Sequence, residues 1–275
     1  MFDKFSRSWT LVKASAAVLR ADRELMLFPV ISSMATLVVL ATFAAPAFVW
    51  RMFANGIDPI SLAWALLFYF CQYSVIIFFN CALVGAAMIR LQGGDPTLAD
   101  GMAVARSRIR SILGYAAIAA TVGVLLQSLK NQDNFFVRLL GGGLGVAWTL
   151  GTFLVVPVMV SQDIGPIDAL KKSVSLLRRT WGENAIGTVG LGFFFGLLSF
   201  AVVIAGALLA YAALQVSSLL ALAVVAIFVI GLLLLGVYQA ALSGVYSAAL
   251  YRYADDGVVP LGFQGAQLER AFAAK

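Results

Sequence analysis

The stretch Val155–Gly187, VVPVMVSQDIGPIDALKKSVSLLRRTWGENAIG, contains the unit from which the whole chain is built. An apolar run carrying Pro157 ends in polar residues, and a Gly165–Pro166 turn follows. A basic amphipathic segment then extends to Trp181, after which a second apolar run begins. This order predicts a membrane span, a surface helix and another membrane span, and the same order recurs elsewhere in the sequence.

The composition favours a membrane protein over a soluble one. Of the 275 residues, 62% are hydrophobic and 12% are charged, whereas soluble domains have about 25% charged residues. A hydrocarbon core of about 30 Å is crossed by about 20 apolar residues in a helix. We therefore predict an all-α polytopic membrane bundle with six transmembrane helices. Uncharged segments occur at residues 25–50, 60–89, 111–129, 139–161 and 184–251, the last being long enough for two spans with a turn near 214–218.

Three amphipathic segments precede the predicted pairs of spans. On each segment, apolar residues recur at spacings of three and four, which places them on one face of a helix. Such helices either lie in the membrane interface or pack on the end of the bundle, and both alternatives stay open here. The stripes are Phe5, Trp9, Val12, Ala16 and Leu19, then Leu98, Met102, Ala105, Ile109 and Ile112, and finally Ile167, Leu170, Val174, Leu177 and Trp181.

The chain is predicted to be a single integral membrane domain, 1–275, made of three units. Each unit is an amphipathic helix followed by a hairpin of spans, a repetition typical of internal duplication. A short fourth surface helix is expected at the end of the chain, near Leu268 and Phe272. The units cover approximately 4–90, 91–161 and 162–250, and a cytoplasmic tail covers 251–275.

The positive charges predict the orientation. Of the 19 Lys and Arg residues, all but Arg51, Lys130 and Arg138 fall in the N-terminal segment, the loops 90–111 and 161–185, or the tail. The positive-inside rule then places both termini and all three amphipathic segments in the cytoplasm. We therefore expect a multipass protein of the cell inner membrane, with an uncleaved first span.

Several residues carry signals for helix starts and kinks. Asp95–Pro96 predicts an N-cap and a first-turn proline for the second amphipathic helix. Gly165–Pro166 is its counterpart in the third segment, where Asp163 and Asp168 are expected to cap backbone N–H groups. Pro157, inside the fourth span, predicts a packed kink, with a functional break as the alternative.

The sequence offers little that an enzyme would use. It has no histidine, which is the commonest general base and a frequent metal ligand. No Lys–Ser/Thr pair follows the run at 141–143, so a phosphate-binding loop is unsupported. Cys71 and Cys81 would lie about 15 Å apart on one helix, too far for a disulfide, and are expected to be buried apolar residues. We expect no enzymatic activity, no cofactor and no metal.

The predicted spans contain few polar side chains and no charge well inside them. Gln72, Asn80 and Gln239 are predicted to form hydrogen bonds between helices, and contact with a ligand is the alternative. Glycines four residues apart allow helix backbones to approach closely, so we predict close packing inside the bundle, with dimerisation as the alternative. The two glycine pairs are Gly141 with Gly145 and Gly192 with Gly196.

Cations on the amphipathic segments are candidates for contact with lipid headgroups. Each cation near a membrane surface contributes about 1 kcal/mol of attraction to anionic lipid, although the same charges also set the topology. Membrane lipids are therefore the expected partners, with a second copy of the chain or another membrane protein as alternatives, and no nucleic acid. The candidates are Lys13, Arg20, Arg106, Arg110, Lys171, Lys172, Arg178 and Arg179.

Three segments resemble known families. Residues 157–184, PVMVSQDIGPIDALKKSVSLLRRTWGEN, resemble a segment of YciC-like proteins and of the membrane domain attached to some glycerophosphodiester phosphodiesterases. Residues 8–32, SWTLVKASAAVLRADRELMLFPVIS, and 250–263, LYRYADDGVVPLGF, are more similar to one uncharacterised six-span bacterial membrane family, a domain of unknown function. This resemblance extends over essentially the whole chain and implies a fold but no activity. It is carried by Trp9, Phe28–Pro29, Pro157, Ala169, Ser173, Trp181–Gly182, Tyr253–Ala254 and Gly257.

Two functions are compatible with these patterns. The first is a non-enzymatic membrane protein that organises lipid or a protein partner through its basic cytoplasmic face. The second is a transporter or channel for a small or lipidic molecule, indicated by the repeated pairs of spans, the glycine-rich helices and Pro157.

Overall fold

The computed structural model describes residues 2–49, 58–130, 134–257 and 263. In this part of the chain the residues form helices and no strand, as the composition predicts. The helices are α1 (Phe2–Ala21), the short 3-10 helix η1 (Arg23–Met26), α2 (Leu27–Val49), α3 (Pro59–Leu91), α4 (Leu98–Ser107), α5 (Ile109–Lys130), α6 (Phe135–Thr152), α7 (Val155–Ser161), α8 (Pro166–Leu214) and α9 (Ser218–Asp256).

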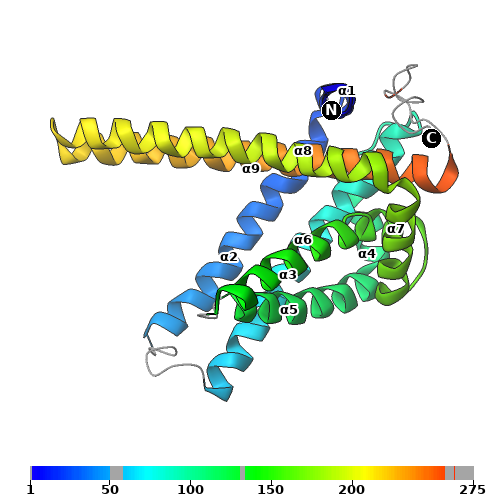
Figure 1. Cartoon of the computed structure of the whole chain (residues 1–275), viewed down its shortest axis with the longest axis horizontal. Helices are drawn as coiled ribbons and strands as arrows, with labels where there is room; N and C mark the ends of the chain where they lie inside the picture. Colours follow the sequence, from blue (N-terminus) through cyan, green and yellow to red (C-terminus); the bar gives the residue numbers. More distant parts are fainter. Residues whose placement is uncertain (1, 50–57, 131–133, 258–262, 264–275) are drawn as a thin grey trace.

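Six helical segments of the described chain are long and apolar enough to cross a membrane. They form three pairs, α2 with α3, α5 with α6, and α8 with α9, whose connected ends point to the same side of the molecule (Figure 1). Helices α1, α4 and α7 and the start of α8 lie toward the opposite side, which we call the base (Figure 1). The prediction of an all-α, six-span bundle is confirmed, and the last turn lies between Leu214 and Ser218 as expected.

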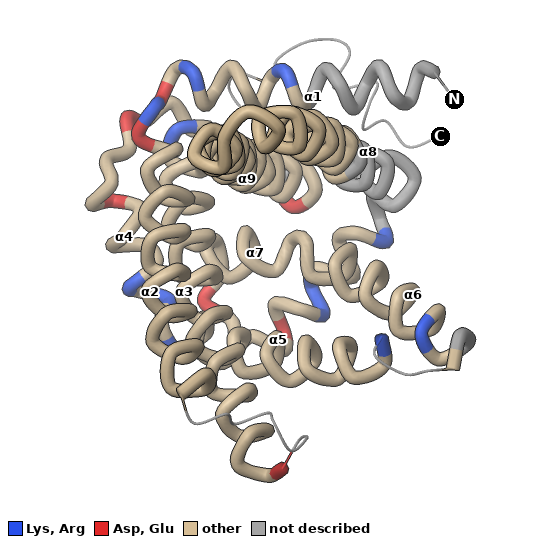
Figure 2. Tube along the Cα trace, turned by 90° about the vertical axis from the view of Figure 1, so that its left-hand side faces the viewer, with Lys and Arg blue, Asp and Glu red and all other residues tan. Residues whose placement is uncertain are grey.

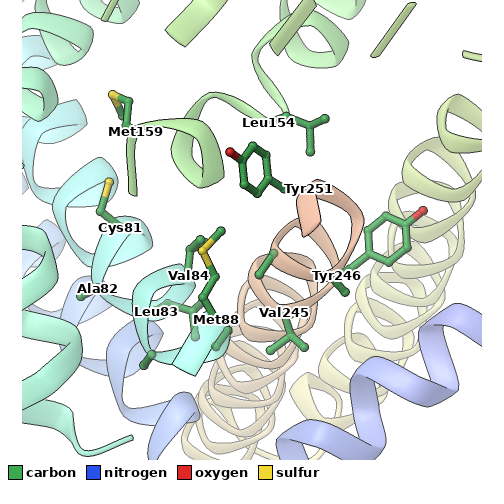
Figure 3. Packing of buried hydrophobic residues seen from close by; sticks show 14 of the residues in the cluster. Cys81, Ala82, Leu83, Val84, Met88, Leu154, Met159, Val245, Tyr246 and Tyr251 are labelled. Carbon is green, nitrogen blue, oxygen red and sulfur yellow. The ribbon is translucent and has the colours of Figure 1, made fainter. Parts of the chain in front are cut away.

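The second half of α3 forms the centre of the hydrophobic core. Most side chains from Ile77 to Leu91 are buried, and α3 contacts α2, α4, α5, α7 and α9. Figure 3 shows Met88 of α3 beside Val245 near the end of α9. Cys81 lies in this core with none of its surface exposed, so the prediction of a buried apolar cysteine is confirmed for it.

The first two amphipathic helices pack on the bundle. Leu19 of α1 is buried, and α1 contacts α8 and α9. Ala105 of α4 is fully buried as well, and α4 contacts α3. At Gly101, a Cβ atom would lie beside the ring of Phe28 and only 2.7 Å from the Ala82 carbonyl oxygen. Helix α4 can therefore approach α3 this closely only because it carries glycine there.

The start of α4 differs from the prediction. The N-cap is Thr97, whose hydroxyl accepts a hydrogen bond from the Asp100 N–H, while the Asp100 carboxylate accepts one from the Thr97 N–H. This reciprocal capping box satisfies two backbone donors at once. Asp95 instead forms an ion pair with Arg90 at 3.2 Å. The predicted cap at Asp95–Pro96 is therefore wrong by two residues, because Thr97 has the better-placed partner three positions ahead.

The fourth span is broken into two helices between Thr152 and Val155. The fully buried Ser173 of α8 lies at this break. Its hydroxyl donates a hydrogen bond to the Gly151 carbonyl at 2.7 Å and accepts one from the Leu154 N–H at 3.2 Å. A side chain from the next helix therefore satisfies backbone groups that a continuous helix would have paired internally. The predicted kink is found just ahead of Pro157.

The third amphipathic segment is not a separate surface helix. It is the beginning of α8, which continues as one helix to Leu214 and becomes the fifth span. Ala169 and Ser173, near its beginning, are fully buried. A break between surface helix and span would leave backbone groups unpaired at the membrane, whereas a continuous helix pairs them. Helices α1 and α4, by contrast, end before their spans begin.

The start of α8 also corrects the predicted caps. Gly165 is the N-cap and Pro166 occupies the first turn, as predicted, but no side chain caps the helix. Asp163 is paired with Arg108, and Asp168 with Lys171 at 3.4 Å. The prediction that Asp163 and Asp168 cap this helix is therefore wrong. Both carboxylates have cationic partners that compete with the backbone N–H groups.

The two glycine pairs have different surroundings. A Cβ atom at Gly141 would lie 2.9 Å from the Cβ atom of Leu129, so α5 and α6 approach closely there and the predicted packing is confirmed at Gly141. At Gly192 and Gly196, no atom of the described residues lies within 4 Å of the corresponding position. The close packing predicted for this second pair is therefore not found in the described part of the chain.

The pair α8–α9 extends beyond the rest of the bundle (Figure 1), and we call its uncharged residues 194–240 the arm. Its side chains are largely exposed, including Phe200 at 63% and Leu222 at 66%, and none from 194 to 251 is charged. Helix α9 becomes buried only near its end, at Ala241 to Tyr251, and it terminates at Gly257, whose φ of 67° favours glycine. An uncharged, exposed surface of this kind suits contact with lipid chains.

Candidate functional site

A network of polar side chains joins α7, α8 and α9 at the base. Tyr251 donates a hydrogen bond to Asp255 at 2.7 Å, and the Gln162 amide donates to both residues at 3.1 Å. Lys172 pairs with the same carboxylate, with 2.8 Å between Nζ and Oδ1. The side chains of Lys172 and Asp255 are only 29% and 22% exposed, so their pair is partly withdrawn from water. These groups bond to one another and hold three helices together.

Two further polar contacts connect distant parts of the base. Arg108, between α4 and α5, forms an ion pair with Asp163 in the turn before α8. The Arg252 guanidinium of α9 donates a hydrogen bond to the carbonyl oxygen of Leu91, at the end of α3, at 3.1 Å. Several cations of the base are therefore engaged in structural contacts.

The residues predicted to contact headgroups differ in their surroundings. Lys172 belongs to the network described above, and the more exposed Lys171 pairs with Asp168. The side chain of Arg179 lies outside the described part of the structure. The remaining candidates are exposed and come from α1, α4, α5 and α8, namely Lys13, Arg20, Arg106, Arg110 and Arg178. Figure 2 shows Lys and Arg on several elements around the bundle, while the visible arm is uncharged.

A cavity of about 550 Å³ lies among α3, α5, α6 and α8. Its volume is within the range of small-molecule sites, about 300–1,000 Å³. Apolar surface predominates in its lining, and Lys130 is the lining residue that carries a charge. The polar and aromatic lining residues are Tyr69, Tyr73, Gln127, Lys130, Trp148 and Thr149.

The walls of this cavity are held by contacts between helices. The rings of Tyr69 and Tyr73 stack on α3, with their centroids 6.3 Å apart. The Tyr73 hydroxyl packs against α5, where a Cβ atom at Gly123 would lie 3.1 Å from it. On the other wall, the Lys130 ammonium lies over α6, 3.7 Å from where a Cβ atom of Gly145 would be. The ammonium therefore folds back along the cavity instead of extending past the end of α5.

A second cavity, of about 480 Å³, lies among α5, α6 and α8. Its lining is almost wholly apolar and includes Leu170 and Val174 from the start of α8. Leu126 and Trp148 line both cavities. The α5–α6 pair is therefore flanked by one cavity that has charged and polar groups in its lining and by another that is almost wholly apolar.

The three predicted intramembrane polar contacts are not brought together in this cavity. Gln72 and Asn80 lie on α3 and Gln239 on α9, and none of them lines it. The Gln72 side-chain oxygen is buried without a hydrogen-bond partner among the described residues. Asn80 and Gln239 are partly buried. The predicted hydrogen bond between helices is therefore not found at Gln72.

Sequence reasoning missed most of the residues that line the cavity. The charge pattern predicts only a role in topology for Lys130, and none of the sequence motifs includes Tyr69 or Tyr73. A usable signal is their spacing of four, which puts both rings on one face of a helix. Another is the lysine that ends the fifth helix, ahead of the glycine pair Gly141 and Gly145. The described residues include no group of three His, Cys, Asp or Glu side chains placed to hold a metal ion.

The fold defines a multipass membrane protein of six helical spans. The chain belongs to a family of unknown function, DUF6159, which matches residues 60–261. Comparisons with curated proteins and with solved structures gave no match. Family membership thus agrees with the resemblance to an uncharacterised membrane family and adds no activity.

Proposed function

We propose that this protein is a non-enzymatic membrane protein that organises anionic lipid, or a partner protein, through cations at its base. The proposal rests on the fact that these cations fall into two groups, those in ion pairs and those that are exposed. Arg108 and Lys172 form ion pairs that join helices, whereas Arg106, Arg110 and Arg178 are exposed and have no described carboxylate as partner. Cations that are not needed for packing are available to attract anionic headgroups.

Neutralising the exposed cations tests this proposal. The triple variant Arg106→Gln, Arg110→Gln, Arg178→Gln is reconstituted in phosphatidylcholine bilayers with and without phosphatidylglycerol. Preference for the anionic lipid should weaken by about 1 kcal/mol per charge removed. Arg138→Gln, at the other end of the bundle and outside the cavity lining, is the control and should leave the preference unchanged. An unaltered preference in a folded triple variant would exclude the proposal.

The orientation belongs to the same proposal. We infer that the base faces the cytoplasm of a bacterial inner membrane, because the base carries most of the Lys and Arg residues. A cysteine placed at Val216, in the α8–α9 turn, should react with an impermeant thiol reagent added to intact cells. A fluorescent protein fused after Lys275 should fold and fluoresce in the cytoplasm. Labelling of the turn only after lysis would reverse the orientation.

Transport of a small or lipidic molecule is a second candidate function. The cavity among α3, α5, α6 and α8 favours it, because a transported molecule needs a polar site between helices. Flux of labelled phospholipid across vesicles containing the protein, compared with empty vesicles, is the direct test. The distant similarity of residues 157–184 to YciC-like proteins and to the phosphodiesterase membrane domain is compatible with both functions and adds no evidence for either.

A further inference from the structure

We propose that the cavity among α3, α5, α6 and α8 binds one anionic phospholipid, with its phosphate at Lys130 and part of an acyl chain along the aromatic wall. This inference concerns binding alone. It depends neither on the cations of the base nor on transport.

The charge of the lining selects the sign of the ligand. Lys130 contributes an ammonium, and the described residues that line the cavity include no carboxylate. Lys130 is exposed, and its ammonium lies over Gly145, where it lines the cavity. Gln127, one turn earlier on α5, adds a second hydrogen-bonding group on the same side. An anionic group placed beside Lys130 would therefore find both a charge and a donor.

The cavity also changes in character along its length. On α5 its lining extends from Lys130 back to Gly123, a rise of about 10 Å along the helix axis. The deeper part is lined by the Tyr73 ring, Trp148 and Leu150. The cavity thus has a polar end near the limit of a span and an aromatic, apolar interior. A phospholipid fits this order, with its headgroup at the polar end and its acyl chain in the interior. A small soluble anion fits it less well, because such an ion would leave the apolar part unfilled.

A lipid can reach this cavity from the side. Val146 lines it and is 58% exposed on the apolar surface of the bundle. Gly192, on the opposite wall, is exposed as well and leaves space where a side chain would otherwise stand. Since both lie in or next to apolar helices, the opening faces the region that the bilayer chains occupy.

Two neighbouring glycines allow a matched test. Gly142 lines the cavity and Gly143 does not, and a Cβ atom at either position would meet no atom of the described residues within 4 Å. Gly142→Leu should fill the cavity without a clash, while Gly143→Leu makes the same chemical change on another face of α6. Comparing the two separates loss of the cavity from any general effect of removing a glycine.

The experiment measures lipid retained by the full-length protein. Wild type and variants are taken from bilayers of equal phosphatidylglycerol and phosphatidylcholine, and native mass spectrometry counts the lipids that remain bound. Wild type should retain one phosphatidylglycerol per chain. Lys130→Gln should lower the preference for phosphatidylglycerol roughly fivefold, as expected for one cation. Gly142→Leu should lose the lipid, and Gly143→Leu should retain it.

Three results would overturn the inference. One is a wild-type protein without a tightly held lipid, and another is equal retention by Gly142→Leu and Gly143→Leu. The third is displacement of the bound lipid by inorganic phosphate alone, which would define a soluble-anion site. The triple variant of the base should still hold the lipid, so that failure of one proposal is distinguishable from failure of the other.

Discussion

The hydroxyl of Ser173 on α8 donates a hydrogen bond to the carbonyl oxygen of Gly151 on α6 at 2.7 Å. The same hydroxyl accepts the Leu154 N–H at 3.2 Å, so one buried side chain bridges the gap between α6 and α7. This contact explains why a serine stands in the middle of the segment that resembles other membrane proteins. It also connects the second pair of spans to the third.

Removing that hydroxyl should destabilise the protein. Ser173→Ala leaves the partly buried Gly151 carbonyl and the buried Leu154 N–H without their partner, at a cost of about 1–3 kcal/mol. Thermal unfolding in detergent is the measurement, and the midpoint should fall. Ser175→Ala, two residues further on an exposed part of the same helix, is the control and should change little. Equal midpoints for the two variants would contradict this account of the break.

The ion pair between Lys172 and Asp255 should show energetic coupling. The pair is partly withdrawn from water and shares its carboxylate with Tyr251 and Gln162. A double-mutant cycle with Lys172→Gln and Asp255→Asn should give a coupling energy on the order of 1 kcal/mol. In the corresponding cycle with the exposed Lys171 and Asp168, a smaller value is expected. The interpretation fails if the exposed pair couples as strongly.

Gly101 should tolerate no larger residue. Gly101→Ala places a methyl group 2.7 Å from the Ala82 carbonyl oxygen and against Phe28, which should cost about 1–3 kcal/mol through overpacking. Gly143→Ala is the matched control, because its Cβ atom meets nothing and alanine favours helix by about 1 kcal/mol. Unfolding midpoints should therefore move in opposite directions. A neutral Gly101→Ala would show that α4 can shift without loss.

Acid should loosen the start of α4. The Thr97 hydroxyl and the Thr97 N–H both donate hydrogen bonds to the Asp100 carboxylate. These bonds, the hydroxyl bond most strongly, lower the pKa of the carboxyl below its ordinary value of 3.8. Because the pKa of Asp100 is lower in the folded state than in the unfolded state, the ionised carboxylate stabilises the fold at any pH above the unfolded-state pKa. This stabilisation is lost as the pH falls through the folded-state pKa. Hydrogen exchange of α4 amides, corrected for intrinsic rates, should accelerate below about pH 4. Asp100→Asn should remove this pH dependence.

The sequence could predict the features that depend on local pattern. Uncharged runs placed the six spans, and the turn between Leu214 and Ser218 followed from the length of the last run. Pro166 in the first turn of α8 followed from the conformational preference of proline. These features need no knowledge of distant residues, since each is set by length, hydropathy or backbone geometry.

The rest depended on partners far away in the chain. Asp163 was expected to cap a helix, but Arg108 lies close enough in the fold to pair with it. Lys172 was expected to contact lipid, but Asp255 engages it inside the base. Lys130 lines the cavity because α5 packs on α6 at Gly141. No periodicity in the sequence specifies which of several carboxylates or cavities a lysine will meet.

The bridge at Ser173 has a consequence for the order in which the protein can be assembled. Gly151 and Leu154 leave the ribosome before Ser173 does, so the fourth span enters the membrane with two backbone groups still lacking their final partner. A chain truncated before Ser173 should therefore fail to stabilise the break between α6 and α7, even though every residue of the second pair of spans has been made. Completion of the second pair of spans waits for the beginning of the third.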